Sequence, residues 1–193
     1  MKFSRVNLGI LAFAGALAFA PLALHAQQNP VVSAVRQTLR RQGQNLTAGA
    51  EEMPADKYNY APTPQHMTFG HLILHIAQSN NLFCSRLAGG QSPSTGRLTE
   101  HSPKNQLIAA MKASFSYCDQ TLSKLSDSDL SGEAPMFGGR SMPKAGILIA
   151  LTNDLADHYA QQAIYLRLNG HLPPTAMHHG MGGPARGKGR GGM

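Results

Sequence analysis

Asp154 and His158 are the residues that could carry chemistry in the last long apolar stretch of the chain, residues 143–170. In a helix with about 3.6 residues per turn, both fall on the apolar side. A carboxylate there is costly to bury unless a partner compensates its charge, and a bound cation is one such partner. The other is an ion pair between these two residues, which are four positions apart. Taken alone, the pair leaves both interpretations open. The residues on this side of the predicted helix are Ile147, Leu151, Asp154, His158, Gln161 and Tyr165.

A third candidate ligand, His75, lies on the apolar side of a helix predicted over residues 68–87. A single histidine on such a side is more often a core residue than a ligand, and His71, one turn earlier, competes with it. Together His75, Asp154 and His158 provide two imidazoles and one carboxylate. Such a set binds a divalent metal and leaves coordination positions open, so we predict a metal site formed by these three residues. The apolar side of this helix consists of Leu72, His75, Ile76, Ser79, Leu82 and Phe83.

The elements that must position these ligands are helices. Besides the two above, apolar spacing predicts one helix over residues 30–53 and another over residues 103–125. Three prolines between residues 54 and 64 favour an extended segment there, and the linker 88–102 is too rich in glycine, serine and proline to be a helix. No convincing strand pattern is present. The sequence therefore predicts an all-α fold, a four-helix bundle.

The two ends of the chain differ from its middle. Residues 1–26 combine Lys2 and Arg5 with an apolar run and a small residue at the exit, which is typical of a secretory signal cut before Gln27. An uncleaved membrane anchor is the alternative, although Pro21 interrupts the run. We expect a helical domain over residues 27–175 and a disordered tail rich in Gly, His, Met and Arg over residues 176–193. The mature protein is then exported, either periplasmic or secreted.

Charge argues against nucleic-acid binding. The formal net charge is +7, but much of the excess lies in the signal and the tail. Between residues 27 and 175 there are 12 Lys and Arg against 10 Asp and Glu, and the chain has no Trp. A nucleic-acid interface needs a basic face with elements that enter a groove or stack on bases. The arginines at positions 36, 40 and 41 are more simply the solvated side of the first helix.

The two cysteines constrain the topology. In an exported protein an isolated pair is more often a disulfide than a metal site, so we predict a Cys84–Cys118 bond. A disulfide needs Cα atoms within roughly 7 Å. An antiparallel hairpin of the second and third helices would separate the two residues by about 15 Å or more, because a helix rises about 1.5 Å per residue. The second and third helices must then run parallel, which the long linker allows. The predicted order is up-down-down-up.

Seven short segments occur in a characteristic order and spacing: YNYAPTP at 58–64, TFG at 68–70, HIA at 75–77, FC at 83–84, YCD at 117–119, DHYAQ at 157–161 and YLRLNG at 165–170. Through these segments the chain resembles the DinB/YfiT-like superfamily of metalloenzymes over residues 31–174. The resemblance implies a four-helix bundle of the same order, with a divalent metal held by one histidine of the second helix and an H-x-x-x-H pair of the fourth. His75 matches the first ligand and His158 the last, whereas Asp154 stands where the family usually has histidine. The ion, zinc, nickel, manganese or iron, is not resolved.

The resemblance implies two kinds of chemistry at such a metal, hydrolysis by an activated water and thiol S-transfer. Neither has a signature of its own in the sequence. No clear general base stands beside the ligands, since Asp157 is about 100° round the helix from His158. We expect an exported metal-binding protein acting as a hydrolase on an unknown small molecule. The alternatives are a thiol S-transferase and a non-catalytic binding or structural domain. No nucleic-acid partner and no lasting membrane insertion after cleavage are expected, and a homodimer is left open.

Overall fold

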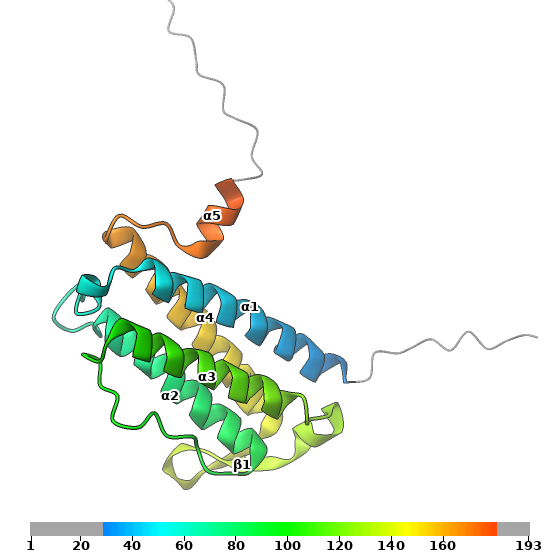
Figure 1. Cartoon of the computed structure of the whole chain (residues 1–193). Helices are drawn as coiled ribbons and strands as arrows, with labels where there is room; N and C mark the ends of the chain where they lie inside the picture. Colours follow the sequence, from blue (N-terminus) through cyan, green and yellow to red (C-terminus); the bar gives the residue numbers. More distant parts are fainter. Residues whose placement is uncertain (1–28, 181–193) are drawn as a thin grey trace, which may run out of the picture.

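Four long helices make up most of the described part of the chain, residues 29–180 of the computed structural model (Figure 1). They are α1 (Pro30–Glu52), α2 (Phe69–Ala88), α3 (Lys104–Leu122) and α4 (Lys144–Leu168). Each lies within two or three residues of its predicted bounds. The predicted signal, residues 1–26, and residues 181–193 of the predicted tail lie outside the described residues. No helix within residues 29–180 has both the length and the hydropathy that a membrane span requires.

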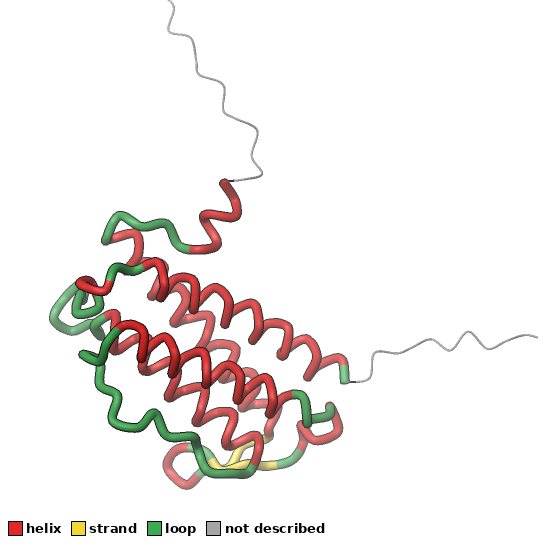
Figure 2. The backbone as a smooth tube through the Cα atoms, in the orientation of Figure 1, coloured by secondary structure: helices red, strands yellow, loops and turns green. Residues whose placement is uncertain are grey.

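The bundle has the predicted up-down-down-up order. In Figure 1, α2 and α3 run side by side in the same direction, while α1 and α4 run the opposite way. Residues 89–103 connect α2 to α3 by running back along the bundle, drawn as the long green loop of Figure 2. Cys84 and Cys118 form the predicted disulfide, with Cα atoms 5.3 Å apart. The largest fully buried side chains come from all four helices and include Leu39, Leu46, Phe69, Ile73, Ile76, Leu107, Met111 and Ile147.

Polar side chains cap the first turns of α1 and α2. The Thr68 hydroxyl accepts a hydrogen bond from the backbone N–H of His71 at 3.1 Å, which caps α2. At the start of α1, the Asp127 carboxylate accepts from the N–H groups of Val31 and Val32 at 3.0 and 2.9 Å. Asn29 in turn accepts from the N–H of Asp127. This reciprocal cap, formed across 98 residues of sequence, fastens the first helix to the α3–α4 connection.

Two glycines in α1 let neighbouring side chains approach the helix backbone. A Cβ added at Gly43 would lie 3.0 Å from the ring of Phe115, on α3. One added at Gly49 would lie 2.7 Å from Cδ of Gln162, on α4, whose amide donates to the Leu46 carbonyl at 3.0 Å. Glycine lowers helix propensity, so the close contacts explain why α1 carries it at these positions.

The expectation that the chain has no strands was wrong in one place. Residues Glu133–Pro135 (β1) and Ser141–Pro143 (β2) form a two-stranded antiparallel hairpin that packs against α2, drawn in yellow in Figure 2. Gly138 and Gly139 turn it, with φ of 68° and 72°. Strands of three residues that each end in proline are too short to show a two-residue period.

Shorter helical elements complete the described residues. Three 3-10 turns are η1 (Ala55–Lys57), η2 (Asp127–Ser131) and η3 (Phe137–Gly139). A seven-residue helix, α5 (Pro174–Gly180), follows α4 and crosses the predicted domain end at residue 175. It begins at a proline, which suits the first position of a helix. The hydroxyl of Tyr159 donates to Thr175 at 2.8 Å and so ties the start of α5 to α4.

Candidate metal centre

The packing of α2 against α4 brings the three predicted ligands together. His75 comes from α2, and Asp154 and His158 come from one side of α4. One candidate ligand atom from each residue can be chosen so that all three lie within 4.8 Å of one another. Asp154 and His158 follow His75 by 79 and 83 residues in the sequence, so only the bundle topology makes them its neighbours. The arrangement is compatible with the predicted site, which itself stays a prediction.

The two rings and the carboxylate lie in close contact. The centroids of the His75 and His158 rings are 4.8 Å apart and their planes are nearly perpendicular, at 84°. Nε2 of His158 lies 3.3 Å from Oδ1 of Asp154. The i,i+4 contact that was the alternative to a metal site is therefore present as well. Donor atoms at such separations can share a single ion with little rearrangement.

Several polar atoms of the cluster lack hydrogen-bond partners. Only 7% of the His158 side chain and 22% of the Asp154 side chain is exposed. Three buried atoms have no hydrogen-bond partner among the described residues. They are the two ring nitrogens of His158 and Oδ2 of Asp154. Buried polar atoms are normally satisfied, because leaving one unpaired costs about 1–3 kcal/mol. A cation would satisfy Oδ2 of Asp154 and one of the two ring nitrogens of His158, so these residues fit a divalent metal.

Electrostatics favours the neutral imidazole that metal binding needs. The pKa of His75 is lowered, chiefly because burial disfavours the charged ring and secondly because His158 stands beside it. Asp154 acts in the opposite direction but does not outweigh burial. A neutral ring keeps a lone pair available for a metal.

Ser79, one turn after His75 on α2, adds a contact that the sequence analysis did not assign. Its hydroxyl lies 3.3 Å from Nε2 of His75. Histidine ligands usually have such a partner, which fixes the ring orientation and the protonated nitrogen. Only the four-residue spacing of Ser79 from His75 could have indicated this contact.

Three other polar residues of α2 and α4, His71, Gln161 and Gln162, do not belong to the cluster. His71 is not one of its members: its Nδ1 lies 2.9 Å from the Glu100 carboxylate. Gln161, expected on the apolar side of α4, donates to the exposed Asp157 at 2.8 Å. Gln162 takes the core position instead, because the buried side follows Leu155, His158 and Gln162. The His71 ring nevertheless lies near the cluster, with its centroid 6.5 Å from that of His75.

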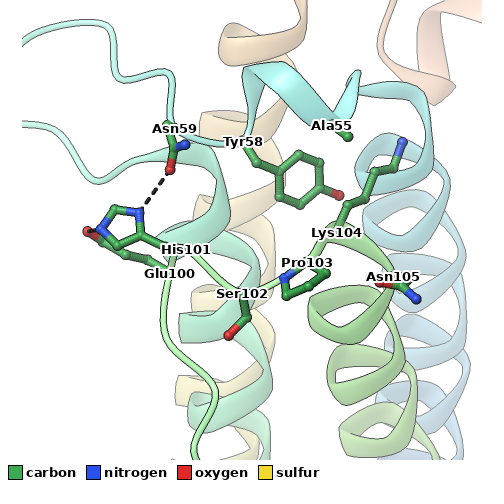
Figure 3. A pocket seen from close by; sticks show the side chains of 9 residues that line it. All are labelled: Ala55, Tyr58, Asn59, Glu100, His101, Ser102, Pro103, Lys104 and Asn105. Atoms are coloured by element: carbon green, nitrogen blue, oxygen red, sulfur yellow. Dashed lines mark hydrogen bonds and ion pairs between the residues drawn. The ribbon is translucent and has the colours of Figure 1, made fainter.

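Among the surface pockets of residues 29–180 are three whose linings do not include the cluster. One of about 440 Å³ lies at the start of α3 and is bordered by Tyr58, His101 and Lys104 (Figure 3). A groove of about 860 Å³ lies between α1 and α3, and a third of about 410 Å³ lies beside Tyr117. The partly exposed Asp154 carboxylate gives solvent an approach to the cluster itself.

Comparison with known proteins gives one family. Residues 38–162 match the DinB superfamily. The sequence matches no curated protein. The fold is shared with a DinB-like protein from Bacillus cereus, at a TM-score of 0.64 and 19% identity, covering 74% of this chain and 95% of that one. A DinB-like protein from Bacillus subtilis aligns at a TM-score of 0.60 and 23% identity, covering 72% and 92%.

An enzyme also shares the fold. A mycothiol-dependent maleylpyruvate isomerase aligns at a TM-score of 0.52 and 17% identity, covering 67% of this chain and 59% of the isomerase. At these identities the structural matches establish the fold alone.

Proposed function

Because this chain belongs to the DinB superfamily, we propose that it is an exported protein that binds one divalent metal ion through His75, Asp154 and His158 and uses it to hydrolyse a small molecule. The observation that carries the proposal is the set of buried, unpartnered atoms on Asp154 and His158, adjacent to the His75 ring. A site retained only as an ion pair would leave fewer of these atoms unsatisfied.

The chemistry follows from the ligand set. His75, Asp154 and His158 would hold the ion, and a divalent cation bound there would supply Lewis-acid chemistry for hydrolysis near neutral pH. The residues of the chain hold and orient this centre. Asp154 supplies a negative charge, which shifts preference towards harder ions than three imidazoles would select. Zinc, nickel, manganese and iron all remain compatible with the set.

Thiol transfer is the second candidate function. The observation that favours it is the fold shared with a mycothiol-dependent isomerase. A metal with open positions can bind a thiol as its thiolate. The thiol is then a co-substrate, because both cysteines of this chain are in the disulfide.

Export is supported by the two cysteines. Cys84 and Cys118 are both fully buried and joined. Disulfides persist in oxidising compartments and are rare in the bacterial cytosol. Together with the predicted signal at residues 1–26, this favours a periplasmic or secreted protein.

Metal content measured by plasma mass spectrometry tests the proposal. The exported protein is purified without a histidine tag, as wild type, as His158→Ala and as His101→Ala, which removes an exposed histidine outside the cluster. We expect about one metal per chain in the wild type and in His101→Ala, and none in His158→Ala. Absence of metal from the wild type, even after reconstitution, would overturn the proposal.

Turnover by the loaded protein separates the candidate functions. Ester and lactone hydrolysis without added thiol supports the hydrolase. A thiol-to-metal charge-transfer band in the cobalt-substituted protein, with thiol-dependent turnover, supports the transferase. One bound metal with neither result identifies a non-catalytic binding domain.

A further inference from the structure

Glu100 is brought to the start of α2 by an unusually close backbone contact. The connection 89–103 passes directly over Gly70, where an added Cβ would overlap the Glu100 carbonyl oxygen and lie 3.3 Å from that of Tyr58. Both contacts are with backbone, which cannot move aside as a side chain can. Glycine is therefore required at position 70 for the connection to take this path.

The Glu100 carboxylate contacts three side chains from this position. Its Oε2 lies 2.9 Å from Nδ1 of His71 and accepts from the Thr68 hydroxyl at 3.4 Å. Its Oε1 lies 3.3 Å from Nε2 of His101. Figure 3 shows Glu100 and His101 together, with the His101 ring bonded to Asn59. A carboxylate at the first turn of a helix is also favoured by the helix dipole.

Glu100 fixes the proton position on His71. An ionised carboxylate can only accept, so Nδ1 of His71 is the donor, and in the neutral ring this leaves Nε2 as an acceptor. The His71 ring lies one helical turn before His75, with its centroid 6.5 Å from that of His75 and the planes at 68°. This separation is of the order that one water or one ligand group spans with two hydrogen bonds of about 2.8 Å. The His71 side chain is 44% exposed, so a ligand can reach it from solvent.

We propose that His71, oriented by Glu100, is a positioning residue that accepts a hydrogen bond from the molecule bound at the metal cluster. The site then selects ligands that carry an N–H or O–H group next to their metal-binding oxygen, such as amides and hydroxamic acids, over ligands that have no donor. This specificity rests on the proposed metal-binding function. A purely structural role, in which Glu100 and His71 only fasten the 89–103 connection to α2, predicts no such selection.

The experiment compares two probes on the cobalt-loaded protein. Acetohydroxamate carries a donor beside its metal-binding oxygens, whereas azide has no donor. Their dissociation constants are measured from the cobalt absorption bands for the wild type, His71→Leu, His71→Gln and Glu100→Gln, with His101→Ala as a control that removes the other histidine contacting Glu100. Thermal unfolding of each variant reports on the structural role separately.

We expect His71→Leu to weaken acetohydroxamate binding about tenfold, as loss of one hydrogen bond does, and to leave azide binding unchanged within about twofold. His71→Gln restores an acceptor and should recover part of the affinity. His101→Ala should match the wild type for both probes. Equal changes for the two probes, or none for either, in a protein that still binds cobalt would overturn the proposal. A wild type that binds no cobalt would instead overturn the metal site, and this proposal with it.

Discussion

Cys84 and Cys118 are joined with their Cα atoms 5.3 Å apart, although each lies near the C-terminal end of its own helix. Two late positions can meet only where the helices run parallel. The disulfide therefore requires α3 to run parallel to α2, which is the feature that defines the up-down-down-up order of the bundle.

Removing the disulfide should lower stability substantially. The bond spans a sequence separation of 34 residues, and closing such a loop in the unfolded chain is worth about 3–4 kcal/mol by the chain-entropy relation. We expect the Cys84→Ala, Cys118→Ala double variant to lose about that much free energy of unfolding, measured by urea denaturation. A loss below about 1 kcal/mol would show that native strain cancels the entropic gain.

Gly49→Ala should destabilise the protein, although alanine is the better helix former. The new Cβ displaces the Gln162 amide, whose bond to Leu46 is buried, and an unsatisfied amide costs about 1–3 kcal/mol. This exceeds the gain of about 1 kcal/mol from helix propensity. Gly146→Ala is the matched control, because a Cβ added at position 146 lies no closer than 3.7 Å to its neighbours. This substitution should raise the free energy of unfolding by about 0.5 kcal/mol. The same sign for both substitutions in thermal unfolding would contradict this account.

Much of the fold could be predicted from the sequence. The four helices follow from their apolar spacing, and their order follows from one geometric requirement on Cys84 and Cys118. The hairpin at residues 133–143 was missed because strands of three residues have no measurable period. On α4 the sequence predicted Gln161 on the buried side, whereas Gln162 is buried. Alternating steps of four and three residues average about 3.5 per turn, so over several turns they drift from the 3.6 residues per turn of a helix.

The site was predictable only in part. His75, Asp154 and His158 stood out because each interrupts an apolar face. The partners of His71 and His75, which are Glu100 and Ser79, could not be identified from the sequence. Glu100 lies 29 residues after His71, in a connection without periodicity, and reaches it only because Gly70 admits the backbone. Contacts of this kind depend on the path of a loop, which no spacing rule specifies.

The stability contributed by Asp119 should depend on pH. Hydrogen bonds from Arg36, and secondly from Arg40, lower the pKa of its carboxyl to about 2. Because this folded-state pKa is below the ordinary value of 3.8, the contribution is complete above about pH 4 and is lost as the pH falls towards 2. The Asp119 side chain is 31% exposed, so we expect Asp119→Asn to lose only about 1 kcal/mol at pH 7. Urea titrations at pH 7 and pH 2 check this, and a difference from the wild type that persists at pH 2 would assign the effect to packing.

Ser79→Ala should weaken metal binding without removing it. The hydroxyl contacts Nε2 of His75, and loss of such a partner typically lowers metal affinity 10–100-fold. Ser79→Thr keeps the hydroxyl and should retain most of the affinity. Ser116→Ala removes an exposed helical serine that bonds only to the Lys112 carbonyl among the described residues, and serves as the control. Competition with a chromogenic chelator measures the four proteins, and equal affinities for Ser79→Ala and the control would remove Ser79 from the site.

Asp154 should determine which ion the cluster prefers. Its carboxylate contributes a hard, charged oxygen beside two imidazoles, and hard ligands favour manganese and iron(II) relative to nickel and zinc. Asp154→Asn preserves the shape but removes the charge, so we expect weaker binding of every divalent ion. Asp154→His replaces the oxygen with a third imidazole nitrogen. We expect it to restore nickel and zinc binding and to leave manganese binding weak, because imidazole suits the later ions of the series. Isothermal titration of the three proteins with manganese, nickel and zinc provides the test. If Asp154→His changed the affinities for all three ions in the same proportion, position 154 would be acting only through charge or packing, and the His158 contact would be its main role.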